Sequence, residues 1–289
     1  MAADDLTNRS TVRRLLREAG IRPAKRLGQS FLVDRGVVDT IARTVGEASP
    51  TRIVEIGAGL GAVTRALAPL ATDVVAIEID RRLVSILERT VGNLDSVTVR
   101  HGDALDYTFD APEGASRTLV FGSLPYASTA PILQHLVARR RAITEAVILT
   151  QREVAAKVEA SPGASGSALG ILVRAYADVA AIRQVGRESF HPVPDVDSTL
   201  WSIRFCEEPR FTAEPEAFFA AVRAIYGARR KMLRVALRPL LPRERVAEVL
   251  QTAGIEGNIR GETLGLEELD QLARALEASG IPFGKGVQS

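Results

Sequence analysis

The chain has 289 residues, of which 46% are hydrophobic, and this is enough for one large domain with a small appendage. Its single cysteine, Cys206, excludes a disulfide within the chain, and its three scattered histidines offer no metal-ligand spacing, so we expect no metal site. Charged residues interrupt the apolar runs and the N-terminus has no apolar signal core, so we expect a cytoplasmic protein without a membrane span.

The N-terminal residues 1–26 are rich in arginine and poor in apolar side chains. The net charge of the chain is only +2, so the position of its basic residues is more informative than their total. A short solvated surface helix would have this composition. A basic segment ending at Lys25 and Arg26 that contacts an RNA phosphate backbone would have it too, and both interpretations stay open at this point.

A short polar turn precedes the first core pattern. Gly28, Gln29 and Ser30 come just before Leu32, and apolar residues at helical spacing follow over residues 37–45. A glycine with two polar residues ahead of a core strand is suited to closing over a ligand, although in isolation it predicts only a turn.

Residues 52–80 predict a strand, a glycine turn, a helix and a second strand over 74–79. Gly57 and Gly59 permit backbone angles and a close ligand approach that a Cβ would block. Glu78 follows the first glycine by about 20 residues, where a carboxylate accepts hydrogen bonds from ribose hydroxyls. The unit therefore predicts a nucleoside site. NAD(P) and S-adenosylmethionine fit it about equally, and a purely structural unit is a third interpretation.

A carboxylate also follows the next predicted strand. Residues 81–91 predict a helix and residues 96–100 a strand, after which comes Asp103. Ligands of doubly wound sheets bind over the carboxyl ends of the strands. Asp103 either caps the next helix or accepts the amino hydrogens of an adenine.

A fourth predicted strand, residues 118–121, leads into Ser123, Leu124, Pro125 and Tyr126. The proline fixes the backbone and leaves the Leu124 carbonyl as an acceptor, while the tyrosine presents a flat face. An acceptor, a polar side chain and an aromatic plate are what a flipped-out base needs. The alternative is a strand-to-helix loop with a packed tyrosine.

Predicted elements continue to residue 205, and an aromatic loop lies among them. They are a helix at 131–138, a strand at 142–150, a helix at 151–160, a Gly/Ser/Pro loop at 161–167, a helix at 169–175, and strands at 178–185 and 197–205. Between the last two strands, prolines hold Phe190 in a stiff segment. Phe190 either packs in the core or supplies the second face of a base-stacking slot.

The composition changes after residue 206, because only helix signals follow. We therefore predict an α/β domain with a basic N-terminal extension over residues 1–206 and a small helical domain over residues 207–289. A cluster of cations in the second domain indicates a nucleic-acid face at least as well as a solvated one: Arg229, Arg230, Lys231 and Arg234.

Several segments, taken in order, resemble one known family. They are LGQSFL, VEIGAGLG, AIEID, GDAL, SLPY, FHPVPDVDS and ARRKMLR. This ordered set resembles the ribosomal RNA adenine N6,N6-dimethyltransferases, whose relatives include macrolide-resistance ribosomal methylases and mitochondrial transcription factor B proteins. The resemblance covers nearly the whole chain. It implies a Rossmann-like S-adenosylmethionine-dependent methyltransferase domain with a small C-terminal all-helical domain, and it favours S-adenosylmethionine over NAD(P).

The resemblance also implies roles for individual residues. The cofactor would be bound by the glycine turn, by the segment that closes over it, and by polar side chains at the sheet edge: Gly57, Gly59, Gln29, Ser30, Leu32, Glu78, Asp103 and Ser123. The target adenine would lie between Tyr126 and Phe190, beside the Ser123 to Pro125 loop.

This chain departs from the family at two positions, because Ser30 and Ser123 stand where the family typically has asparagine. At Ser123 the family's amide carbonyl accepts a hydrogen from the target N6 amine. A serine hydroxyl is shorter and donates as well as accepts. We therefore expect catalysis that is slower or that favours one methyl over two.

By resemblance, the chain dimethylates two adjacent adenosines in the 3′-terminal hairpin of small-subunit ribosomal RNA, on a 30S precursor. We expect a monomer, because no segment of the sequence demands an oligomer. One alternative is a large-subunit rRNA methylase that confers macrolide-type resistance. Another is a weakly catalytic or non-catalytic assembly or nucleic-acid-binding factor, for which Ser123 is the best indication. A dehydrogenase is disfavoured because nothing after Asp103 supplies a hydride-transfer partner.

Overall fold

The computed structural model describes residues 4–24, 28–110, 118–160 and 166–280. It divides into two compact units, and each is described here by itself. The α/β unit comprises Met1–Ala155 and Asp178–Phe205, and the helical unit comprises Ala156–Ala177 and Cys206–Ser289. The chain last enters the helical unit at Cys206, one residue before the sequence-based boundary, and residues 156–177 belong to that unit as well.

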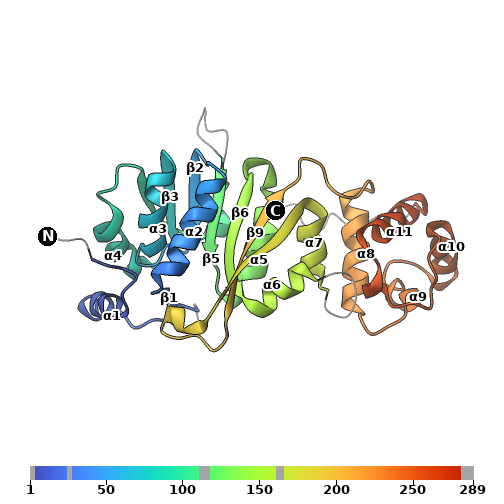
Figure 1. Ribbon diagram of the computed structural model, residues 1–289. Helices are drawn as coiled ribbons and strands as arrows, with labels where there is room; N and C mark the ends of the chain where they lie inside the picture. The colour runs from blue at the N-terminus through green and yellow to red at the C-terminus, as the bar shows by residue number, and fades with distance from the viewer. Residues whose placement is uncertain (1–3, 25–27, 111–117, 161–165, 281–289) are drawn as a thin grey trace. The chain divides into compact units, whose positions relative to one another are not determined.

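A seven-stranded sheet forms the centre of the α/β unit, with the strand order β4-β3-β2-β5-β6-β9-β7 (Figure 1). Its strands are β2 (Arg52–Ile56), β3 (Asp73–Glu78), β4 (Val97–His101), β5 (Thr118–Ser123), β6 (Glu145–Gln151), β7 (Ala177–Val185) and β9 (Ser198–Phe205). Strands β4, β3, β2, β5 and β6 are parallel, and β9 is antiparallel to β6. A separate two-stranded sheet pairs β1 (Phe31–Leu32) with β8 (Phe190–His191).

The helices up to β6 are α1 (Arg9–Glu18), α2 (Arg35–Glu47), α3 (Ala62–Leu67), α4 (Arg81–Val91) and α5 (Tyr126–Ala138). After β6 come α6 (Arg152–Glu159) and α7 (Ala168–Tyr176). The central parallel strands β2, β3 and β5 are almost entirely buried, as expected of strands covered on both faces. The edge strand β4 instead alternates, with Val97 and Val99 half-buried and Thr98 exposed.

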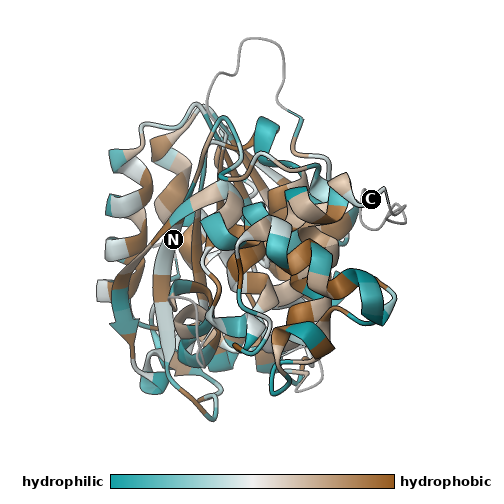
Figure 2. Cartoon of the chain, turned by 90° about the vertical axis from the view of Figure 1, so that its right-hand side faces the viewer, coloured by the Kyte–Doolittle hydropathy of each residue, from teal (hydrophilic) through white to brown (hydrophobic). Residues whose placement is uncertain are grey.

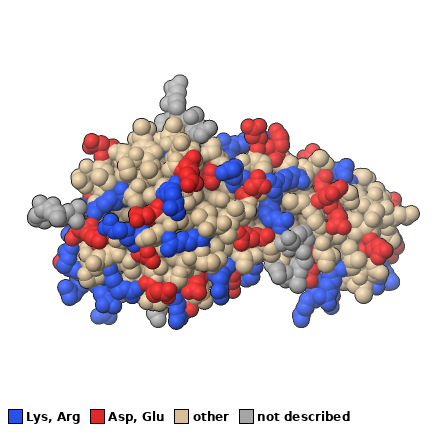
Figure 3. All heavy atoms as spheres, viewed as in Figure 1, with Lys and Arg blue, Asp and Glu red and all other residues tan. Residues whose placement is uncertain are grey.

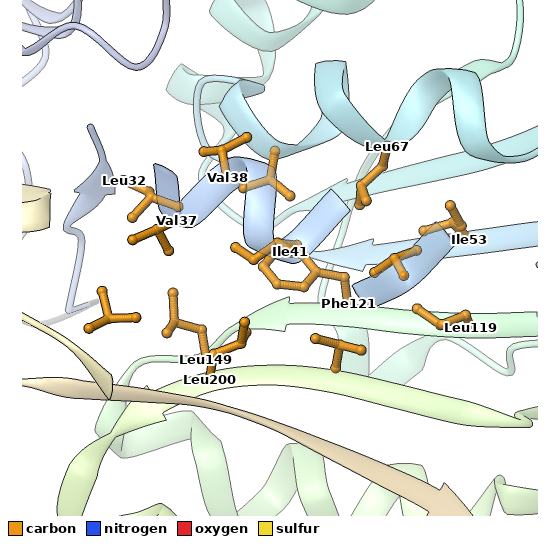
Figure 4. Packing of buried hydrophobic residues seen from close by; sticks show 14 of the residues in the cluster. Leu32, Val37, Val38, Ile41, Ile53, Leu67, Leu119, Phe121, Leu149 and Leu200 are labelled. Atoms are coloured by element: carbon orange, nitrogen blue, oxygen red, sulfur yellow. The ribbon is translucent and has the colours of Figure 1, made fainter. Parts of the chain in front are cut away.

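One core cluster anchors this unit, and in it α2 and α3 pack on one face of the sheet (Figure 4). Apolar residues of α2 recur at helical spacing, and Asp34 caps the helix by accepting from the Val37 N–H at 3.1 Å. Ile41 of α2, Ile53 of β2 and Phe121 of β5 lie in this cluster and are essentially inaccessible to solvent. The cluster holds the strand ends, where the predicted site residues lie, in fixed register.

After Cys206 the described part of the helical unit contains the helices α8 (Pro215–Gly227), α9 (Leu233–Ala236), α10 (Arg243–Ala253) and α11 (Leu266–Ala278). Tyr176 at the end of α7 packs against Phe211 and Phe219, and Phe211 stacks on Phe218 with ring centroids 4.2 Å apart. These aromatic contacts explain why residues 156–177 fold with the helical unit. Figure 2 shows hydrophobic residues along the strands and mixed hydropathy around the helices.

Across the described ranges, no helix has the length and apolar character needed to cross a membrane.

Candidate cofactor and target site

A small cavity of about 50 Å³ lies beside the glycine turn at the carboxyl end of β2. It is lined by five residues that the sequence singles out: Ser30, Leu32, Gly57, Gly59 and Ser123. They come from the turn before α2, the turn after β2 and the end of β5. The structure therefore brings together segments that are up to 93 residues apart, from position 30 to position 123.

Two glycines allow these segments to approach each other. Gly57 has a φ of +75°, and a Cβ there would lie 3.5 Å from the Ser123 carbonyl oxygen. Gly28 has a φ of +61°, and a Cβ there would lie 2.5 Å from the Cβ of Pro125. Side chains at these positions would be strained and, at residue 28, would collide with the loop after β5. The close approach of the cofactor turn and the target loop therefore depends on glycine.

The N-terminal helix α1 also borders the cavity. Leu6 and Val12 line it, and both belong to a buried cluster that includes Leu60 of the glycine turn and Phe31. Arg65 holds the segment in place by donating to the Asp4 carbonyl at 2.6 Å. Residues 9–18 of the basic N-terminal segment thus form an amphipathic helix whose apolar face packs against the cofactor turn.

Glu78 ends β3 and is only 5% exposed. Its Oε2 accepts from the Gly59 N–H at 2.9 Å, and its Oε1 accepts from the Asp80 N–H at 2.9 Å. Burial raises the pKa of Glu78, and these backbone hydrogen bonds oppose the rise. A carboxylate has about four lone-pair sites and the backbone N–H groups of Gly59, Ile79 and Asp80 act on this one, so acceptor capacity remains for a ribose hydroxyl.

Gln29 connects the N-terminal turn to the residues after β3. Its Nε2 donates to Asp80 Oδ2 at 2.8 Å, and its Oε1 accepts from the Ala24 N–H at 2.7 Å. Hydrogen bonds from Arg82 hold the pKa of Asp80 well below its ordinary value, so Asp80 stays a charged acceptor. Gln29 therefore orients the turn, and it is absent from the residues that line the cavity.

Asp103 is exposed and caps the following short helical turn, because its Oδ1 accepts from the Leu105 N–H at 2.9 Å. The Gly102 N–H donates to the Glu78 carbonyl at 3.1 Å, which holds Asp103 beside the end of β3. The structure thus shows the capping role, and Oδ2 remains an acceptor. Its contact with an adenine stays a prediction.

The target loop begins at Ser123. The Leu124 N–H donates to the Leu149 carbonyl at 2.9 Å, and Leu124 is buried. No described residue donates a hydrogen bond to the Leu124 carbonyl, and Pro125 has no N–H to compete for it. The carbonyl is therefore an available acceptor next to the Ser123 hydroxyl, which borders the cavity.

The second predicted target residue, Phe190, pairs with Leu32 across the β1–β8 sheet. Phe190 is 4% exposed and packs in the same core cluster as Leu32. The Ser30 hydroxyl donates to the Pro192 carbonyl at 2.8 Å, so the cofactor segment and the target segment are joined. Tyr126 begins α5, but its side chain lies outside what the structure describes. The stacking slot thus stays a prediction.

Cations of α1 lie near β8. Arg9 donates to the Glu188 carbonyl at 2.6 Å. Burial lowers the pKa of His191, and the charges of Arg13 and Arg9 lower it further. These arginines place positive charge beside the predicted target segment. Lys25 and Arg26 lie outside the described residues.

The sequence-based prediction missed Glu55. This side chain in β2 lines the cavity and is buried, and its Oε2 has no hydrogen-bond partner among the described residues. Burial raises the pKa of Glu55 to about 8. An orphaned carboxyl oxygen in a cofactor cavity fits a cationic ligand, and S-adenosylmethionine carries an ammonium and a sulfonium. The sequence feature that points to Glu55 is its position inside a predicted buried strand directly before the glycine turn.

In the helical unit, the predicted RNA-binding cations differ in their contacts. Arg230, Lys231 and Arg234 are exposed. Arg229 is partly buried and donates to Glu262 Oε2 at 2.8 Å. Basic side chains lie along the lower edge of this unit in the view of Figure 3. The structure therefore leaves part of the predicted cluster free for solvent or a ligand.

Comparisons with known proteins identify the family of the chain. Residues 21–277 match the family model described as "Ribosomal RNA adenine dimethylase". The "Ribosomal RNA small subunit methyltransferase A" of Moorella thermoacetica is 41% identical over 275 residues, covering 91% of this chain and 96% of that protein. The protein of the same name from Thermobifida fusca is 38% identical over 269 residues, covering 91% of this chain and 93% of that protein.

Two solved structures are similar in fold. A dimethyladenosine transferase from Plasmodium falciparum has a TM-score of 0.75 at 24% identity, covering 87% of this chain and 99% of that chain. The 23S rRNA methyltransferase ErmE has a TM-score of 0.65 at 27% identity, covering 86% of this chain and 99% of that chain. These similarities confirm the predicted fold class, a Rossmann-like methyltransferase domain with a small helical domain.

Proposed function

The chain belongs to the ribosomal RNA adenine dimethylase family, and we propose that it dimethylates two adjacent adenosines in the 3′-terminal hairpin of small-subunit rRNA. It is an S-adenosylmethionine-dependent rRNA adenine N6,N6-dimethyltransferase. The structural observation that carries the proposal is the single cavity in which the glycine turn, the N-terminal segment and the Ser123 loop meet.

The cofactor supplies an electrophilic methyl group when it is bound. In the proposed arrangement, the glycine turn at Gly57 and Gly59 accommodates its methionine part, and Glu55 faces its positive charge. Glu78 accepts the ribose hydroxyls with its remaining lone pairs, and Asp103 accepts the adenine amino hydrogens. Ser30 and Leu32 close the cavity from the N-terminal side, and Gln29 orients that segment through Asp80.

The target adenine is oriented by acceptors of the protein. The Leu124 carbonyl and the Ser123 hydroxyl accept the hydrogens of the N6 amine, which draws its lone pair out of conjugation with the ring. Tyr126 and Phe190 stack on the two faces of the base. No strong general base is needed, because the amine loses its proton after it has become cationic. Positioning and polar acceptors supply the rate enhancement.

Ribosomal RNA is the substrate class of the family, and we place its phosphate backbone on the cations of both units. In the α/β unit these are the cations of α1 together with Lys25 and Arg26. In the helical unit they are Arg230, Lys231 and Arg234, with Arg229 behind them. The proposed particle is a 30S precursor in the cytoplasm, and the proposed acting species is a monomer.

A second candidate function is methylation of large-subunit rRNA, because ErmE is 27% identical and is a 23S rRNA methyltransferase. Incubating the protein with labelled S-adenosylmethionine and under-methylated small subunits tests the first function. Label in the small-subunit rRNA supports it. Label that enters only large-subunit rRNA, located by primer-extension stops, supports the second. Label in neither RNA would leave a non-catalytic assembly factor as the better description.

A further inference from the structure

A second cavity, of about 450 Å³, lies within the helical unit. Its volume falls in the range of roughly 300–1,000 Å³ that is typical of sites for small organic ligands. It is lined by Arg234, Arg238, Arg243, Val246, Ala247, Leu250, Gln251, Ile255 and Gly257. None of these residues lines the cofactor cavity, so this is a separate site.

Three arginines border this cavity, and they are exposed. Within the described residues, none of Arg234, Arg238 and Arg243 forms an ion pair with a carboxylate. Arg234 and Arg238 are four residues apart and border the same cavity, so their like charges repel each other. Residues 228–243 contain no acidic residue that would offset these charges. An anionic ligand would remove the repulsion.

The backbone fixes the position of Arg234. Its N–H donates to the Gly257 carbonyl at 3.0 Å, and the neighbouring Leu233 N–H donates to the Ile259 carbonyl at 2.7 Å. A Cβ at Gly257 would lie 3.3 Å from the Cβ of Arg234 and 3.0 Å from Leu250 Cδ1. Glycine at this position therefore allows the arginine segment to lie directly against the end of α10.

Part of the cavity lining is apolar. Val246 and Leu250 of α10 are buried, and Ile255 follows after Gly254, which ends the helix with a φ of +68°. The Ile255 N–H donates to the Leu250 carbonyl at 3.0 Å and so holds the isoleucine at the cavity. Gln251, which is exposed, supplies an amide that can both donate and accept at the cavity rim.

We propose that this cavity binds one unstacked nucleotide of the rRNA substrate. The arginines contact its phosphate groups, the base lies against Leu250 and Ile255, and Gln251 hydrogen-bonds to an edge of the base. Proteins that recognise single-stranded RNA combine these features, since splayed bases pack on side chains while cations follow the backbone. A bare phosphate would not use the apolar part of the lining. The inference rests on the proposed function, because rRNA is the ligand.

The first test removes the charges. The variant Arg234→Gln/Arg238→Gln/Arg243→Gln is compared with Arg43→Gln/Arg89→Gln/Arg223→Gln, which removes the same charge from exposed positions outside the cavity. Binding to under-methylated small subunits is measured against salt concentration. The plot of log K against log salt has a negative slope, and each lost phosphate contact reduces the magnitude of that slope by about 0.7–0.9. For the cavity variant we expect the magnitude of the slope to fall by about 1 to 2 and the affinity to fall by about tenfold. The control variant should show neither change. Equal losses in both variants would overturn the proposal.

The second test locates the nucleotide. In a Cys206→Ser background, Gln251→Cys places a thiol at the cavity, and Thr252→Cys places one at the next exposed residue, which does not line it. Bound small subunits should slow maleimide alkylation of the Gln251→Cys variant at least tenfold and that of the Thr252→Cys variant less than twofold. Equal protection of both thiols, or of neither, contradicts the proposal.

A methyl-transfer assay on the same particles separates the two claims. If the unmodified protein methylates the subunits while the Gln251→Cys thiol reacts equally fast with and without them, the cavity proposal fails and the enzymatic function stands. If no methyl group is transferred, the proposed function fails, and the alkylation result still decides whether the cavity binds RNA.

Discussion

Replacing Glu55 with glutamine should change how stability depends on pH in the cofactor-free protein. Burial raises the pKa of the Glu55 carboxyl from 4.5 to about 8 in the folded chain. In the unfolded chain the carboxyl ionises near its ordinary pKa, so between pH 4.5 and 8 only the folded state holds the proton. Stability from this group is therefore fully present below pH 4.5 and is lost as pH rises toward 8.

The size of the effect follows from the same shift. At pH 7 the solution lies 2.5 units above the value of 4.5, and 1.36 kcal/mol per unit gives a loss of about 3 kcal/mol. Glutamine keeps the shape of the side chain and does not titrate. The free energy of unfolding of Glu55→Gln, minus that of the unmodified protein, should therefore rise by about 3 kcal/mol from pH 4.5 to pH 7.

Urea unfolding followed by circular dichroism at several pH values measures this difference. Glu88→Gln, which changes an exposed carboxyl on α4, is the matched control and should track the unmodified protein. S-adenosylhomocysteine, which keeps the ammonium, should bind more tightly as pH rises from 6 to 8, and this trend should disappear in Glu55→Gln. A difference in unfolding free energy that stays constant from pH 4.5 to 8 would refute the reasoning.

Three further predictions concern the target loop, the turn that packs on it and the core. Ser123→Asn should raise single-turnover methyl transfer about tenfold if the hydroxyl is the weaker acceptor, and an unchanged rate would show that serine suffices. Gly28→Ala should weaken S-adenosylhomocysteine binding about tenfold in calorimetry, because its Cβ would lie 2.5 Å from Pro125. Gly227→Ala, which lies in the helical unit and has no atom within 4 Å, should bind normally. Phe121→Ala should lower the free energy of unfolding by about 3–5 kcal/mol in urea; a loss below 1 kcal/mol would contradict its place in the core.

The spacing of apolar residues along the sequence predicted the elements of the α/β unit well wherever that spacing has a clear helix or strand period. The helix expected over residues 81–91 is α4 with the same bounds, and the strand expected over 74–79 is β3 to within one residue. Pattern failed for β1 and β8, because strands of two residues have no measurable alternation. It also placed the start of α5 at residue 131, since a proline usually marks a helix start, whereas Pro131 lies inside the helix.

The site was predictable to the extent that its residues flank glycines or end strands. Gly57, Gly59 and Ser123 meet at one cavity as the strand order requires. Glu55 was missed although a glutamate inside a buried strand before the glycine turn is a signal, because its unpaired oxygen depends on packing that a sequence does not reveal. The hydrogen bond from Ser30 to Pro192 joins segments 162 residues apart and was equally invisible.

The central claim is the transfer of methyl groups to small-subunit rRNA, and mass spectrometry of rRNA digests tests it most directly. Under-methylated small subunits are incubated with the protein and S-adenosylmethionine, and the modified nucleosides are then mapped. Two adjacent N6,N6-dimethyladenosines in the 3′-terminal hairpin are the expected result. Unmodified adenosines in that hairpin, with the protein bound and the cofactor present, would contradict the account.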